Sequence, residues 1–118
     1  MKAEQQTTLP EVVLLFDARS ARPENAVGIG GFWYEPEIWT LPLSPAPKVL
    51  YAALCSFLGH GQINRRDLRN ALKGSTDEEL TTALKDLVRH RLLVPADRVT
   101  NSGTVAGFEV RSVEEFEG

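Results

Sequence analysis

Residues 45–94 have the sequence PAPKVLYAALCSFLGHGQINRRDLRNALKGSTDEELTTALKDLVRHRLLV, in which three helical patterns follow one another with very short joins. Apolar residues recur at helical spacing in each pattern, and this predicts helices near 45–58, 65–73 and 76–90. The third pattern places its leucines on a single face, as a helix that packs on a core must do.

Local signals at the ends of these patterns support the helix borders. Ser44 and Asn64 precede the first and second helices, where a side-chain oxygen can accept a hydrogen bond from the first turn. Ser75 and Glu78 have the spacing of a capping box for the third helix. Gly74 lies in the short join between the second and third helices. Two short helices joined by a tight turn with glycine predict a helix-turn-helix.

Strands are expected on both sides of the helices. The apolar run 11–17 predicts a buried strand, and the aromatic run 32–34 predicts another. After the helices, 92–94 predicts a strand, and 105–113 returns as its partner beyond a turn cluster at 101–103. The predicted fold is therefore α+β: a winged helix-turn-helix with a three-helix core, a C-terminal β-hairpin wing and an extra N-terminal strand.

Length and composition limit the possible domain organisation and cellular location of the protein. The 118 residues suit one domain, predicted at 11–113, with a loose N-terminal segment at 1–10 and an acidic tail at 114–118. The chain has one cysteine, so no intramolecular disulfide is possible, as is usual in a reducing cytoplasm. No apolar run is long enough to cross a membrane, and the N-terminus lacks the pattern of a signal peptide. We expect a cytoplasmic protein with no membrane partner.

Charge is distributed unevenly along the chain. The net charge is -3, yet residues 62–91 carry seven cationic and five acidic side chains. In a helix-turn-helix the second helix crosses the DNA backbone and the third enters the major groove. The third helix begins with Glu78 and Glu79, which would face phosphates. The candidate DNA-binding residues are Arg65, Arg66, Arg69, Asn70 and Lys73 on the second helix, Thr82, Lys85 and Arg89 on the third, and Arg98 near the wing.

Catalytic and metal sites are not expected. Cys55 has the spacing of a small buried residue on the first helix. His60 and His90 belong to no set with ligand spacing. The glycines of 28–31 precede an aromatic run where a phosphate-binding loop would precede a helix, so we expect a flexible turn before a strand. The chain is predicted to be no enzyme and to need no cofactor and no metal.

Apolar residues outside the helices predict a protein interface. Alternation in a strand would expose some members of the runs 12–16 and 32–34, and the first strand is a candidate for self-association by edge pairing. We expect a homodimer. The candidate interface residues are Val12, Leu14, Phe16, Trp33 and Trp39.

Residues 30–54, GGFWYEPEIWTLPLSPAPKVLYAAL, and residues 63–94, INRRDLRNALKGSTDEELTTALKDLVRHRLLV, carry a resemblance to a known group. In element order and apolar spacing, roughly residues 30–113 resemble the winged helix-turn-helix domains of bacterial and phage replication-initiation proteins and replisome organisers. The DnaD-type N-terminal domain is a distant relative in that group. The resemblance implies a role linked to nucleic acid, through DNA contact or through assembly of a complex on DNA.

Two functions remain open. The first is a non-enzymatic protein that binds double-stranded DNA as a transcriptional regulator or a replication-initiation accessory factor. The alternative is a winged helix used as a protein–protein interaction or oligomerisation module without direct DNA contact.

Overall fold

The computed structural model describes residues 12–19, 24–29, 32–58 and 62–118 and has an α+β fold. The loose segment expected at 1–10 lies outside the described residues. The helices are α1 (Pro45–Phe57), α2 (Arg65–Ala71) and α3 (Asp77–Arg89), with short 3-10 helices η1 (Pro36–Thr40) and η3 (Val113–Glu115). The strands are β1 (Val12–Asp17), β2 (Val27–Ile29), β3 (Phe32–Tyr34), β4 (Gln62–Asn64), β5 (Leu93–Pro95), β6 (Arg98–Thr100), β7 (Gly103–Val105) and β8 (Gly107–Val110).

The positions predicted for α1, α2 and α3 are confirmed to within two residues at each end. Asn64 caps α2 as expected: its side-chain oxygen accepts from the Asp67 N–H at 3.0 Å, and the Asp67 carboxylate accepts from the Asn64 N–H at 2.9 Å. Ser44 occupies the N-cap position of α1, but its side chain makes no capping hydrogen bond. Pro45 at the first position of α1 has no N–H that needs a partner.

The cap predicted for α3 is wrong by one residue. The capping box is formed by Thr76 and Glu79, with distances of 3.1 Å from the Glu79 N–H to Thr76 Oγ1 and 2.8 Å from the Thr76 N–H to Glu79 Oε1. Ser75 still belongs to the preceding turn, since its N–H donates to the Leu72 carbonyl at 3.0 Å. Gly74 makes that turn possible with a φ of 86°, a conformation that glycine adopts without strain.

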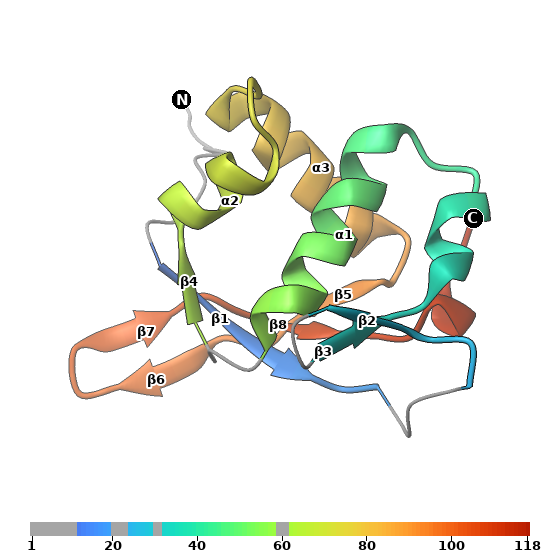
Figure 1. Cartoon of the computed structure of the whole chain (residues 1–118). Helices are drawn as coiled ribbons and strands as arrows, with labels where there is room; N and C mark the ends of the chain where they lie inside the picture. Colours follow the sequence, from blue (N-terminus) through green and yellow to red (C-terminus); the bar gives the residue numbers. More distant parts are fainter. Residues whose placement is uncertain (1–11, 20–23, 30–31, 59–61) are drawn as a thin grey trace.

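The main sheet has the strand order β4-β1-β8-β5. Strand β1 lies between β4, to which it is antiparallel, and β8, to which it is parallel. Strand β1 is therefore internal to the sheet, paired with β4 over Val12–Leu14 and with β8 over Leu14–Asp17, and this position disfavours the edge pairing expected for it. The helices lie above one face of this sheet, and the hairpin of β6 and β7 extends beyond it at the end where β4 and α2 lie (Figure 1).

Two shorter segments differ from the sequence-based expectation. Gly28 and Ile29, predicted to form a turn, belong to β2, which pairs antiparallel with β3. The rest of that predicted turn, 30–31, lies outside the described residues. The single strand predicted over 105–113 is divided: Val105 ends β7, β8 follows, and Val113 begins η3. The break at Ala106 lets β7 pair with β6 while β8 pairs with β1 and β5.

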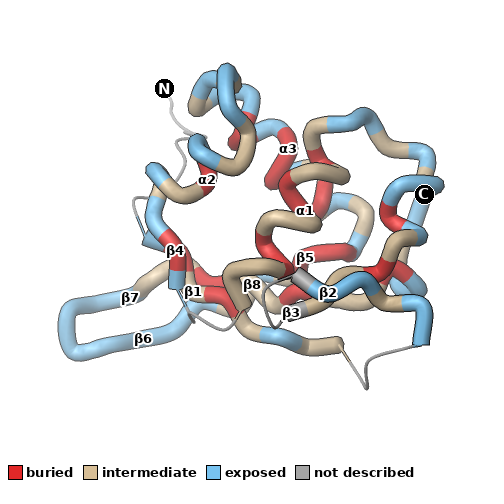
Figure 2. Tube along the Cα trace, in the orientation of Figure 1, coloured by how far each residue is buried: buried red, intermediate tan, exposed pale blue. Residues whose placement is uncertain are grey.

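The hydrophobic core fills the space between the helices and the main sheet, where Figure 2 shows the buried segments. Each fully buried leucine stabilises the fold by about 2 kcal/mol through removal of its side chain from water. The largest fully buried side chains are Ile38 of η1, Pro47, Leu50, Tyr51 and Leu54 of α1, Leu68 of α2, Leu80 and Leu87 of α3, Leu92 just before β5, Leu93 of β5 and Val110 of β8.

Hydrogen bonds and a ring contact connect the C-terminal residues to the rest of the fold. The buried carboxylate of Glu35 accepts from Ser112 Oγ at 2.9 Å and from the Val113 N–H at 3.0 Å. The Glu117 N–H donates to the His90 carbonyl at 2.9 Å, and the Phe116 ring stacks on the His90 ring with centroids 5.0 Å apart. Much of the acidic tail thus packs near the end of α3.

Candidate nucleic-acid interface

Helix α2 presents its cationic side chains to solvent. Leu68 is buried and turns one face of α2 toward the core, so the remaining positions point outward. Arg65 is half-buried, while the other predicted contacts on this helix and the turn after it are exposed: Arg66, Arg69, Asn70 and Lys73. Helical periodicity predicts a solvent face that carries these four residues, with Arg65 beside it, and their exposure agrees with that prediction.

Part of this cationic charge is neutralised within the chain. Asp77 begins α3, and its carboxylate lies 3.3 Å from Arg69 Nη1 and 3.9 Å from Arg65 Nη1. Arg66 and Lys73 make no ion pair with residues that the structure describes. The cations of α2 that are free to meet a phosphate are therefore fewer than the sequence indicates.

Helix α3 has a mixed surface. Lys85 is exposed and has no ion-pair partner among the described residues, whereas Arg89 Nη2 lies 2.8 Å from Asp86 Oδ1. Thr82 is exposed, and its hydroxyl donates to the Glu78 carbonyl at 3.0 Å. Glu78 is exposed, as the sequence predicted, and gives the first turn of α3 an anionic surface.

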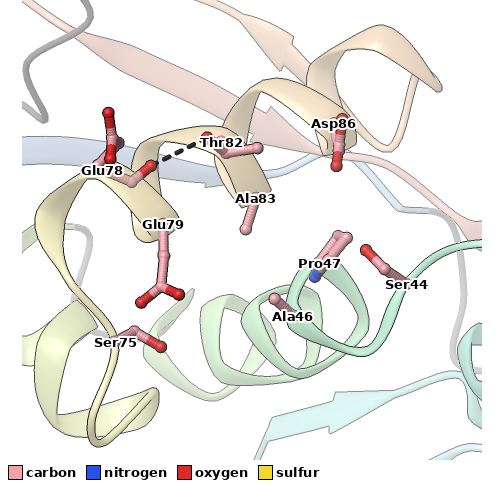
Figure 3. A pocket seen from close by; sticks show the side chains of 9 residues that line it. All are labelled: Ser44, Ala46, Pro47, Ser75, Glu78, Glu79, Thr82, Ala83 and Asp86. Carbon is pink, nitrogen blue, oxygen red and sulfur yellow. Dashed lines mark hydrogen bonds between the residues drawn. The ribbon is translucent and has the colours of Figure 1, made fainter.

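An open pocket of about 370 Å³ separates the start of α1 from α3 (Figure 3). Its carboxylates come from α3, and its apolar floor comes from both helices. The pocket could not be predicted from the sequence, because its two walls, 44–47 and 75–86, are distant in the chain. The pocket repels phosphate and favours a cationic group. It is lined by Ser44, Ala46, Pro47, Ser75, Glu78, Glu79, Thr82, Ala83 and Asp86.

The β6/β7 hairpin offers a polar tip. Gly103 has a φ of 116°, and Thr100 Oγ1 donates to its carbonyl at 2.8 Å, which closes the turn. Val99 is 85% exposed on the hairpin. Arg98 was expected to extend the cationic patch, but its guanidinium lies over the Phe16 ring, 4.2 Å from the centroid. Arg98 is thus directed toward the base of the hairpin.

The candidate interface residues fall into two places. Val12, Leu14 and Phe16 share the face of β1 opposite the helices, because Val13 and Leu15 between them are buried against the core. Trp33 and Trp39 lie elsewhere, on β3 and η1. The residues of β1 and the two tryptophans therefore belong to different elements, and a partner could contact one set without the other.

Trp33 and Trp39 also differ from each other in exposure. Trp39 is 43% exposed, and its indole N–H donates to the Tyr34 hydroxyl at 3.2 Å. Trp33 is partly buried beneath Arg19, whose guanidinium lies 3.7 Å from the ring centroid. Trp39 is therefore the more accessible of the two for a partner.

Arg19 is a buried cation that sequence reasoning did not single out. Its side chain is 1% exposed and forms a bidentate pair with Asp17 at 2.9 and 3.2 Å. Nη1 donates to the Trp33 carbonyl at 2.7 Å and contacts Cys55 Sγ at 3.5 Å. Burial alone would lower the pKa of Arg19, but the hydrogen bond and charge of Asp17 outweigh it and raise that pKa. The Arg19 guanidinium is thus enclosed within the fold, while the Asp17 side chain that pairs with it remains 41% exposed.

Cys55 is buried, as its spacing predicted. Burial raises the pKa of the Cys55 thiol to about 12, with nearby Arg19 acting in the opposite direction. The thiol is therefore protonated at neutral pH and is a poor nucleophile there.

In the described ranges, no group of three or more His, Cys, Asp or Glu side chains is placed to hold a metal ion. None of the helices that the structure describes has the length and apolar character needed to span a bilayer. The chain matches no protein-family model, no curated protein and no solved structure.

Proposed function

We propose that the chain is a winged helix-turn-helix protein in which α1, α2 and α3 form the helical unit and β6 and β7 form the wing. The proposal rests on the order of the elements and on the tight turn at Gly74 that joins α2 to α3. In this interpretation β4, β8 and β5 form the sheet of the winged helix, and β1 is an additional strand inserted between β4 and β8.

The proposed function is non-enzymatic binding of double-stranded DNA in the cytoplasm, in transcriptional regulation or as an accessory to replication initiation. The observation that carries it is the exposed cationic face of α2 at the same end of the molecule as the projecting hairpin (Figure 1). Arg66, Arg69 and Lys73 would contact phosphates, and the polar tip of the wing would follow the neighbouring groove. Glu78 and Glu79 oppose close entry of α3, so the binding is expected to be weak.

A salt series of binding to random duplex DNA tests this function. A few phosphate contacts per subunit correspond to a log–log slope of about -2 to -4, with micromolar or weaker affinity at physiological salt. Replacing Arg66, Arg69 and Lys73 by Ala should flatten the slope. Lys48→Ala is the control, because Lys48 lies on α1 and donates to the Trp39 carbonyl at 2.9 Å, and it should leave the slope unchanged. Absence of duplex binding at low salt would contradict the proposal.

A second candidate function, assembly with another protein, is favoured by the acidic pocket. A basic side chain of a partner would find the carboxylates of Glu78, Glu79 and Asp86 around an apolar floor. The paired substitution Glu78→Gln with Glu79→Gln distinguishes the two functions, because it should change the binding affinity in opposite directions. It should tighten DNA binding by removing anionic charge near the phosphates, but it should weaken attachment of a basic partner.

A homodimer is compatible with both DNA binding and assembly with another protein. The proposed homodimer would use the outer face of β1, where Val12 is 37% exposed and Leu14 and Phe16 are partly exposed. Pairing of two such faces would cover apolar surface that the helices leave open.

A further inference from the structure

Asp77 has an unusual place between the two helices of the helix-turn-helix. It is the first residue of α3, and its carboxylate faces back toward α2, with Oδ1 3.3 Å from Arg69 Nη1 and Oδ2 3.9 Å from Arg65 Nη1. Both arginines belong to the face of α2 on which the proposed DNA contact depends. One acidic residue therefore lies within ion-pair distance of two cations of α2.

The Asp77 carboxylate is not needed to cap α3. Thr76 and Glu79 form the capping box, and the hydrogen bond from Thr81 Oγ1 reaches the Asp77 backbone carbonyl at 2.8 Å. Within the described residues, the arginines are the side chains with which the Asp77 carboxylate makes its ion pairs and hydrogen bonds. A carboxylate in the first turn does interact favourably with the helix dipole, and that contribution is modest.

We propose that Asp77 restrains the DNA affinity of α2 by holding Arg69, and Arg65 beside it, in intramolecular ion pairs. This inference rests on the proposed function and assigns a regulatory residue within the same site. A phosphate that binds Arg69 must compete with a carboxylate already 3.3 Å away. While Arg69 stays in the pair with Asp77 it neutralises no phosphate, and it therefore releases no condensed counterion from the DNA.

The ion pairs are exposed enough to be displaced. The Arg69 and Asp77 side chains are 49% and 41% exposed, so water and salt screen their attraction. The restraint is therefore partial: it lowers affinity and the number of phosphate contacts without abolishing binding. Other charges nearby also act on an approaching phosphate: Arg66 and Lys73 of α2 and the turn after it attract it, and Glu78 and Glu79 of α3 repel it.

The test compares Asp77→Asn with Glu78→Gln. Each removes one negative charge from the first turn of α3, but Glu78 makes no ion pair with the described residues. Asp77→Asn should tighten binding to random duplex DNA about three- to tenfold near 50 mM salt and steepen the log–log salt slope by about 0.9 for each phosphate gained. Glu78→Gln should tighten binding less and leave the slope unchanged.

A double-mutant cycle then checks that the arginines carry the effect. In an Arg65→Gln/Arg69→Gln background, Asp77→Asn should have no larger effect than Glu78→Gln has there. Thermal unfolding of each variant confirms folding, and Asp77→Ser replaces Asp77→Asn if the latter does not fold.

Three results would overturn the inference. Equal effects of Asp77→Asn and Glu78→Gln would mean that Asp77 acts only through general electrostatics. Weaker binding by Asp77→Asn would mean that Asp77 positions the arginines for phosphate contact. A gain that persists without the arginines would exclude the ion pairs as its cause. If the wild-type chain and every variant fail to bind duplex DNA at low salt, the proposed function itself fails, and the inference falls with it.

Discussion

Arg19 joins three parts of the fold through one side chain. Its guanidinium is paired with Asp17 at the end of β1, donates to the backbone of β3 at Trp33, and touches Cys55 on α1. A cation buried in this way needs all its partners, since an unpaired polar group in the interior is costly. At the scale of single residues, Arg19 is thus the clearest polar determinant of the tertiary structure.

Replacement of Arg19 by Ala is expected to lower the free energy of unfolding by about 1–3 kcal/mol, because it removes the ion pair with Asp17 and leaves the Trp33 carbonyl without its donor. Arg19→Lys should be intermediate, since an ammonium cannot form the bidentate pair or lie flat on the indole ring. Urea unfolding followed by Trp fluorescence measures the free energy of unfolding of both Arg19 variants. The exposed Arg66→Ala should stay within about 0.5 kcal/mol of wild type. If Arg19→Ala left the free energy of unfolding unchanged, the contacts of Arg19 would contribute little to stability.

Helix ends are decided by short-range hydrogen bonds. Asn64 with Asp67 and Thr76 with Glu79 are complete capping boxes at the starts of α2 and α3. The two boxes flank the turn at Gly74 and set where each helix begins. At the scale of elements, the borders of α2 and α3 are thus defined by local hydrogen bonds, and the two helices pack on the core through Leu68 and Leu80.

Thr76→Ala is expected to lower the free energy of unfolding by about 1 kcal/mol, because the Glu79 N–H loses its acceptor. Ser75→Ala is the matched control one residue earlier. It should change stability by only a few tenths of a kcal/mol, about the amount usual for a substitution away from a cap. Chemical unfolding of the two variants side by side would distinguish them, and a larger effect at Ser75 would contradict the assigned cap.

The central position of β1 makes deletion of the N-terminal residues a poor test of self-association. Because β1 is central in the main sheet, deletion of residues 1–31 would remove the partner of both β4 and β8. Loss of a dimer in that deletion would therefore reflect unfolding as readily as loss of an interface. Point substitutions in the full chain are the sharper test at the scale of the whole molecule.

We expect light scattering of the full chain to detect a homodimer that Val12→Ser weakens. Val12 is 37% exposed on the outer face of β1, and burial of that face would supply the driving force. Val99→Ser is the control, since it changes an 85% exposed valine of the β6/β7 hairpin. It should leave the dimer intact. A wild-type chain that stays monomeric at high concentration, or equal effects of the two substitutions, would exclude the proposed face.

Sequence alone determined the positions of α1, α2 and α3, the cationic face of α2 and the burial of Cys55. Helical periodicity, capping residues and Gly74 act over a few residues, so their effects can be inferred from neighbouring positions in the chain. The error at Ser75 was small for the same reason: two capping patterns, Ser75 with Glu78 and Thr76 with Glu79, overlap in the sequence.

Only the tertiary structure decided where β1 lies, which cations remain free and where the acidic pocket forms. These features join residues distant in the chain, such as Leu14 with Gly107 in the sheet and Ser44 with Glu78 around the pocket. Strand order and side-chain pairing depend on which surfaces meet when the core is buried, and local periodicity carries no information about that choice. The same limit explains why a cationic α2 was predicted but its restraint by Asp77 was not.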